Sequence, residues 1–145
     1  MTENTEASLY QLEKWINECN ANHPRCQHAR ETRMAEEFFI PTRLIELIEG
    51  GRLRLVETSQ WSDQQKSSPY LTLSHCWGDP KVFTMFCTYP SNVKEFLQVG
   101  IELPELPKTF KNVMNLARKL GINYVWIDSI CVIQGKFGDF NIEAQ

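Results

Sequence analysis

The feature that most constrains this sequence is a strongly amphipathic segment, residues 107–120, between two short apolar segments. Its apolar side chains recur at helical spacing, and they are Phe110, Val113, Met114, Ala117 and Leu120. Pro107 suits the first helical turn, and Gly121 suits the residue after a helix. The flanking segments, 70–74 and 122–127, have the composition of strands. This order predicts a right-handed crossover between parallel strands, and therefore an α/β fold.

Further elements are predicted by local signals along the chain. Residues 8–20 carry apolar side chains at helical spacing, with Ser8 placed to cap the helix. Residues 43–49 and 52–58 alternate between apolar and polar, and Gly50-Gly51 between them predicts a hairpin turn. A short helix is expected over 91–99, closed by Gly100.

Two other segments are less regular. Residues 79–89 are ambiguous, and a strand around 83–87 is one interpretation. Asp139 is placed to cap a helix whose first turn carries Glu143. A parallel sheet normally continues past such a helix, so we interpret the fold as a partial parallel sheet with TIR-like or flavodoxin-like winding and an interrupted C-terminal end.

The length of the chain, 145 residues, predicts one hydrophobic core. We divide the sequence into residues 1–40, a helix followed by a connector with cysteine and histidine, and residues 41–145, the α/β domain. Lys and Arg number 15 against 18 Asp and Glu, and the basic residues are scattered, which argues against nucleic acid as a partner. No secretory signal or membrane-spanning apolar run is visible, and five cysteines are read as reduced thiols, so a cytoplasmic location is expected.

Candidate chemistry lies where the two predicted parallel strands end, because ligands bind near the carboxyl ends of such strands. The residues there are Ser74, His75, Cys76, Asp128 and Ser129. A thiol, an imidazole and a carboxylate suggest a cysteine hydrolase with Cys76 as nucleophile, a histidine as base and Asp128 as orienting acid. The alternative is that Cys76 is a small buried side chain beside Trp77 and that Asp128 caps the turn after its strand. Trp77, Trp126 and Ile127 are predicted to belong to the core.

A second candidate site precedes the α/β domain. Cys19, His23, Cys26 and His28 form a C-x3-H-x2-C-x-H cluster, and thiolates with imidazoles are the ligands that zinc prefers. The alternative is that Cys19 packs the end of a helix and the others lie in a solvated loop, with a Cys19–Cys26 disulfide also open. Apart from this zinc, and NAD as discussed below, no cofactor is predicted.

Charged residues elsewhere have simple interpretations. Lys108, Lys111, Arg118 and Lys119 are read as the solvated face of the amphipathic helix. Asp139 and Glu143 are read as favourable charges at a helix N-terminus rather than as acid-base catalysts.

Several segments together resemble the fungal heterokaryon incompatibility (HET) domain family. They are PTRLI at 41–45, RLRLVET at 52–58, YLTLSHCWG at 70–78, LPKTF at 106–110 and LGINYVWIDSICVIQ at 120–134. The resemblance covers about 19–145, and the family often carries Cys and His residues ahead of its PTR segment. After Gln134 the sequence departs mildly from the family, which usually has an acidic pair and an Asp-Trp before a Glu.

The resemblance implies the N-terminal part of a HET domain, acting in fungal non-self recognition and programmed cell death. It implies a signalling module with protein partners, including self-association, rather than an enzyme. HET domains are also distantly similar to TIR domains, some of which cleave NAD with a glutamate. That glutamate would fall beyond Gln145, so the enzyme cannot be assigned to this chain by matching residues. The alternative is a TIR-like NAD-cleaving or nucleotide-binding enzyme whose catalytic part lies beyond residue 145. No glycine-rich phosphate loop accompanies the sheet edge.

Overall fold

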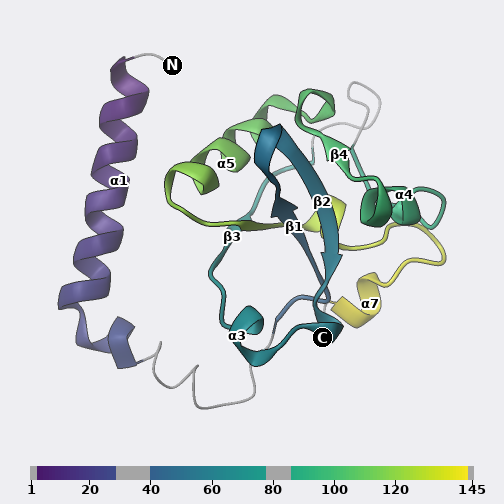
Figure 1. Cartoon of the computed structure of the whole chain (residues 1–145), viewed down its shortest axis with the longest axis horizontal. Coiled ribbons are helices and arrows are strands. Elements are labelled where there is room, and N and C mark those ends of the chain that lie inside the picture. The colour runs from purple at the N-terminus through teal and green to yellow at the C-terminus, as the bar shows by residue number, and fades with distance from the viewer. Residues whose placement is uncertain (1–2, 29–39, 78–85, 144–145) are drawn as a thin grey trace. The chain divides into compact units, whose positions relative to one another are not determined.

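The structure is a computed structural model that describes residues 3–28, 40–77 and 86–143. The chain divides into two compact units, Met1–Phe39 and Ile40–Gln145 (Figure 1). Within the described residues, no helix is both long enough and apolar enough to cross a membrane.

The first unit is dominated by one helix, α1, Glu3–Asn22. This confirms the helix predicted over 8–20 and extends it toward the N-terminus, so the prediction that Ser8 caps the helix is wrong because Ser8 lies inside it. The helix breaks at His23, and residues 24–28 are helical again. The apolar face of α1 is only partly covered, since Leu9 and Leu12 are half-buried and Trp15 is 61% exposed.

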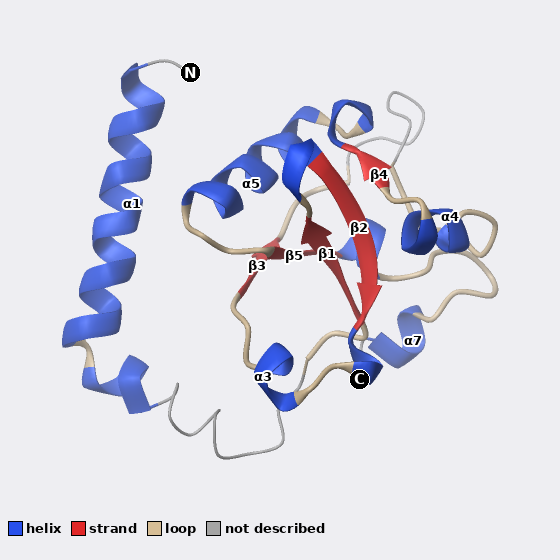
Figure 2. Cartoon of the chain, viewed as in Figure 1, coloured by secondary structure: helices blue, strands red, loops and turns tan. Residues whose placement is uncertain are grey.

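The second unit is built on a five-stranded sheet in the order β3-β5-β1-β2-β4 (Figure 2). Its strands are β1, Arg43–Leu47; β2, Arg52–Glu57; β3, Tyr70–Leu73; β4, Ile101–Glu102; and β5, Tyr124–Ile127. β3 and β5 pair in parallel, with Leu73 opposite Ile127, which confirms the predicted crossover pair. The other pairs, β1 with β5, β1 with β2, and β2 with β4, are antiparallel. The sheet is therefore mixed.

The predicted hairpin is confirmed as β1 and β2. The turn between them, η1 Glu49–Gly51, places Gly50 at φ 76° and Gly51 at φ 84°. Residues with a Cβ rarely adopt such angles, so the two glycines make the tight reversal possible. The hairpin is part of the main sheet, because Ile45 of β1 lies opposite Val125 of β5.

The connections contain helices of different lengths. They are α3, Asp63–Lys66; α4, Val93–Gln98; α5, Lys108–Lys119; α6, Asp128–Cys131; and α7, Phe140–Glu143, with short 3-10 turns η2 Thr58–Gln60 and η3 Leu103–Glu105. The helices predicted over 107–120 and 91–99 are confirmed as α5 and α4. The strand proposed around 83–87 lies mostly outside the described residues, and its described part, Phe86 and Cys87, forms a loop and not a strand.

The core of the second unit lies between the sheet and α5. Phe110, Met114 and Ala117 of α5 are buried at helical spacing, and they share one cluster with buried side chains of the sheet. Along β2 the buried side chains Leu53 and Leu55 alternate with exposed arginines, as expected for a strand with one covered face. The buried face of α5 thus covers one face of the sheet.

Candidate functional site

The parallel pairing of β3 and β5 brings the residues after both strands to one edge of the sheet. Leu73 and Ile127 are register partners, so the loop after β3 and helix α6 start side by side. Nδ1 of His75 lies 3.7 Å from Oδ1 of Asp128. The imidazole also meets the ring of Phe110 edge-on, with the ring centroids 5.0 Å apart. The sheet edge therefore brings together an imidazole and a carboxylate that are 53 positions apart in the sequence. The imidazole lies against Phe110 of the core.

Asp128 is the centre of this group. Trp77 Nε1 donates a 2.7 Å hydrogen bond to Oδ2 of Asp128, and the backbone N–H of Ser129 donates a 2.8 Å bond to Oδ1. The second bond is the turn-capping role predicted for Asp128. The first makes Trp77 a half-buried, hydrogen-bonded side chain rather than a purely apolar core residue.

The cysteine at this edge lies elsewhere than one interpretation placed it. Cys76 is exposed, so its interpretation as a small buried side chain beside Trp77 is wrong. The reason is that β3 ends at Leu73, which leaves Cys76 in the following loop instead of between the sheet and α5. Ser74 is exposed as well. The described contacts join His75 to Asp128 but include none between Cys76 and an imidazole, so they do not assemble the catalytic arrangement of a cysteine hydrolase.

The other residues predicted for the edge and the core differ in how deeply they are buried. Ser129 and Ile127 are buried, and Trp126 is half-buried against the core cluster. Among the described residues, the Ser129 hydroxyl has no hydrogen-bond partner.

The thiol of Cys87 has a raised pKa. Burial raises this pKa most, a hydrogen bond with Tyr89 lowers it, and the charge of Asp128 raises it further.

A buried ionic group was missed by the sequence interpretation. The Arg43 side chain is 5% exposed, donates from Nε to the carbonyl oxygen of Cys131 at 2.8 Å, and forms an ion pair with Asp139. Glu143 lies 3.9 Å from the same guanidinium. The interpretation of Asp139 and Glu143 as helix N-terminal charges is therefore incomplete, because both carboxylates face Arg43. The signal that the sequence offered was an arginine beside the apolar residues of a predicted strand.

The first unit brings together three of the four predicted metal ligands. The ligand atoms of Cys19, His23 and Cys26 all lie within 4.8 Å of one another. The Cys19 thiol donates to the Cys26 sulfur at 3.3 Å, and the two are not joined in a disulfide. His28 is outside this group. Two thiols and an imidazole at this spacing have the chemistry of a zinc ligand set.

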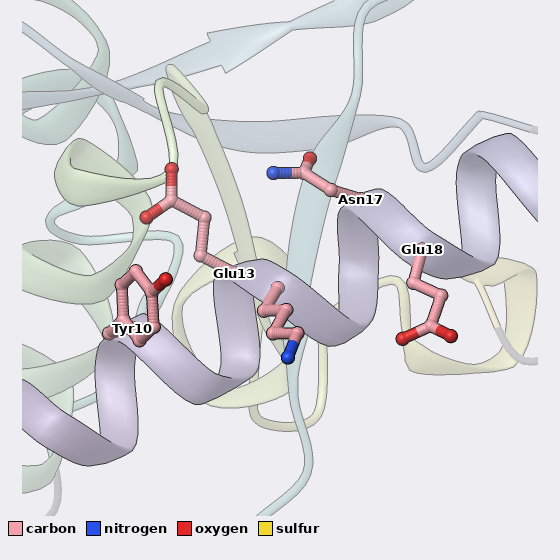
Figure 3. Close-up of a pocket in the computed structure, with 5 residues that line it drawn as sticks. Tyr10, Glu13, Asn17 and Glu18 are labelled. Atoms are coloured by element: carbon pink, nitrogen blue, oxygen red, sulfur yellow. The ribbon is translucent and has the colours of Figure 1, made fainter.

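A hollow on the surface of α1 is a weaker candidate for a functional site. Figure 3 shows its lining side chains, which are Tyr10, Glu13, Lys14, Asn17 and Glu18. These positions follow the three- and four-residue spacing of one helix face, and their charges are mixed. The hollow is thus the open surface of a single helix, and it gathers no convergent set of catalytic groups.

Comparison with known proteins matches most of the second unit to one protein family. The family model described as heterokaryon incompatibility protein (HET) matches residues 70–145, more than half of the chain. That range contains β3, β5 and the edge formed by His75, Trp77 and Asp128. Neither the curated proteins nor the solved structures gave a match. The match over this range and the motifs it contains establish that the chain belongs to the heterokaryon incompatibility (HET) family.

Proposed function

We propose that this chain is an interaction and effector module of fungal non-self recognition, which promotes programmed cell death through protein contacts in the cytoplasm. Family membership supports the biological setting, since heterokaryon incompatibility is the process for which the family is named. The observation that carries the mode of action is an exposed apolar surface near α7.

We use the name C-terminal apolar surface for three exposed side chains in α7 and the loop just before it, Phe137, Phe140 and Ile142. These side chains are 83%, 62% and 72% exposed. Single exposed apolar residues are ordinary on proteins, but three large ones within six positions favour a site of protein contact. Aromatic side chains are also enriched at interfaces. The first partner that we assign to the surface is a second copy of the chain, as expected for a signalling scaffold.

Sedimentation velocity of the purified chain over a range of concentrations tests the proposal. We expect the chain to associate as its concentration rises, and the combined variant Phe137→Ser, Phe140→Ser, Ile142→Ser to stay monomeric. Val99→Ser is the matched control, because Val99 is 63% exposed but lies outside this surface. A parental chain that stays monomeric throughout, or a triple variant that associates equally, would refute self-association.

The same variants expressed in a fungal host test the effector role. We expect loss of viability with the parental chain and with Val99→Ser, and survival with the triple variant at equal protein level. Survival of the host with the parental chain, or death with the triple variant, would contradict an effector that acts through this surface.

A second candidate function is a TIR-like enzyme that binds or cleaves a nucleotide such as NAD. The observation that favours it is the His75–Asp128 pair at the carboxyl edge of parallel strands, where ligands of α/β proteins bind. Cellular NAD measured in the same fungal cultures separates the two functions. NAD loss that is abolished by His75→Gln but not by the exposed control Asp63→Asn would favour the enzyme; death with NAD unchanged would favour the scaffold.

A further inference from the structure

We propose that Cys19, His23 and Cys26 bind one zinc ion at the end of α1, with a water molecule as the fourth ligand. The three ligand atoms come from a short stretch of chain, but only its particular turn brings them together. The proposal concerns the first unit and is independent of the function proposed for the second.

The backbone of the turn places the three side chains. Cys19 lies in the last turn of α1, and the N–H of His23 still donates to the Cys19 carbonyl oxygen, at 3.3 Å. The helix then breaks, and the N–H of Cys26 donates to the carbonyl oxygen of His23 at 3.0 Å. This second turn directs Cys26 back to Cys19.

Gln27 fixes the same turn from its other side. Its side-chain amide donates to the carbonyl oxygens of Asn20 and Ala21, at 3.3 and 2.7 Å. The last carbonyl groups of a helix lack partners within the helix, so these bonds satisfy groups that otherwise need water. The arrangement of the ligands is therefore supported before any metal binds, which lowers the cost of ordering the site.

The distances and the donor types suit zinc. Two thiolates bound at about 2.3 Å to a tetrahedral zinc lie about 3.8 Å apart. The sulfur atoms of Cys19 and Cys26, at 3.3 Å, need to separate by only a few tenths of an ångström. Thiolates and imidazoles favour zinc over magnesium and calcium, which prefer oxygen ligands. Cys19 is half-buried, whereas His23 and Cys26 are exposed, which leaves one side of the site open to water.

A metal would also serve the stability of this unit. The first unit comprises Met1–Phe39, and chains of fewer than about 40 residues rarely fold without a metal, a disulfide or a partner. Its large apolar side chains Tyr10 and Trp15 are 71% and 61% exposed, so its described part has little apolar core. Zinc would join the end of α1 to the turn that follows it, and binding would stabilise both.

Titration of the fully reduced chain of 145 residues with Co²⁺, a spectroscopic substitute for zinc, tests the proposal. We expect one equivalent to bind, with a thiolate-to-cobalt charge-transfer band, visible bands typical of tetrahedral cobalt, and displacement by one equivalent of Zn²⁺. A thiol count before the titration ensures that Cys19 and Cys26 are reduced. A fully reduced chain that binds no Co²⁺ and no Zn²⁺ would overturn the proposal.

Single substitutions identify the ligands. We expect Cys19→Ser and Cys26→Ser to abolish the charge-transfer band, and His23→Asn to lose tetrahedral binding. Cys76→Ser is the matched control, because Cys76 is an exposed thiol of the other unit, and His28→Asn tests the fourth predicted ligand. Both should leave binding unchanged. Retention of the band in Cys19→Ser or Cys26→Ser, or its loss in Cys76→Ser or His28→Asn, would refute the three-ligand site.

Discussion

Arg43 and Asp139 form an ion pair inside the second unit, although 96 positions separate them in the chain. The Arg43 side chain is 5% exposed and that of Asp139 is 20% exposed. Asp139 also accepts a 2.8 Å hydrogen bond from the backbone N–H of Ile133. The pair thus connects strand β1 with the loop that precedes α7.

Arg43→Met should destabilise the second unit by about 3–5 kcal/mol, because it leaves Asp139 and Glu143 without their cation in a largely buried place. Urea unfolding measures the loss. Arg54→Met is the matched control: Arg54 pairs with Glu46 at 2.6 Å, but the side chains are 46% and 26% exposed. That variant should lose less than about 1 kcal/mol. Equal losses in the two variants would contradict the structural role of the buried pair.

Much of the fold is predictable from local sequence signals. The buried face of α5, with Phe110, Met114 and Ala117, follows from helical periodicity, and the reversal at Gly50 follows from turn chemistry. The insertion of the hairpin beside β5 was not predicted, because strand neighbours are chosen by packing between distant segments and leave no periodic pattern in either strand.

The candidate site was also predictable only in part. The parallel pairing predicted that the residues after β3 and β5 meet, and His75 and Asp128 do lie together. Neither the exposure of Cys76 nor the Trp77–Asp128 hydrogen bond could be predicted, since side-chain directions in a loop depend on its backbone angles rather than on a repeat. The buried position of Arg43 requires two distant carboxylates that sequence periodicity does not connect to it.

The bond between Trp77 and Asp128 should contribute measurably to stability. Trp77→Phe removes the donor but keeps an aromatic ring, and we expect a loss of about 1–2 kcal/mol because the acceptor is a carboxylate. A double-mutant cycle with Asp128→Ala isolates the interaction. The control cycle pairs Asp128→Ala with Trp61→Phe, since Trp61 packs on Tyr124 at the opposite end of β5 and should give additive losses. Additivity in the Trp77 cycle as well would refute the contribution of this bond.

Stability should fall at alkaline pH partly through Cys131. Burial, the largest effect, raises the pKa of this thiol from 9.0 to about 12. Between these values the unfolded chain loses the thiol proton and the folded chain keeps it. The free energy of unfolding therefore falls as pH rises, by up to about 1.4 kcal/mol per pH unit from this group. Well below pH 9 the thiol is protonated in both states and contributes no pH dependence.

Cys131→Ala tests this effect by urea unfolding at several pH values from 8 up to the raised pKa of about 12. The variant should show a shallower decline than the parental chain. Other groups titrate in the same range, including Cys87 and Tyr124, whose pKa values burial also raises. The difference between the two curves removes these shared contributions. Parallel curves would contradict a raised pKa of Cys131.

Gly100 and Gly121 separate two reasons why a glycine is required. Both have positive φ angles, 101° and 68°. A Cβ at Gly100 would lie 2.5 Å from the backbone oxygen of Leu53, whereas a Cβ at Gly121 would meet no atom within 4 Å. Gly121→Ala should therefore cost about 1–2 kcal/mol through its backbone conformation alone. Gly100→Ala carries a similar conformational cost and must also displace β2, which should add about 1–3 kcal/mol. Thermal or urea unfolding measures the stability of both variants. If the Gly100→Ala protein were as stable as the Gly121→Ala protein, the segment after α4 would be able to move away from β2 without cost.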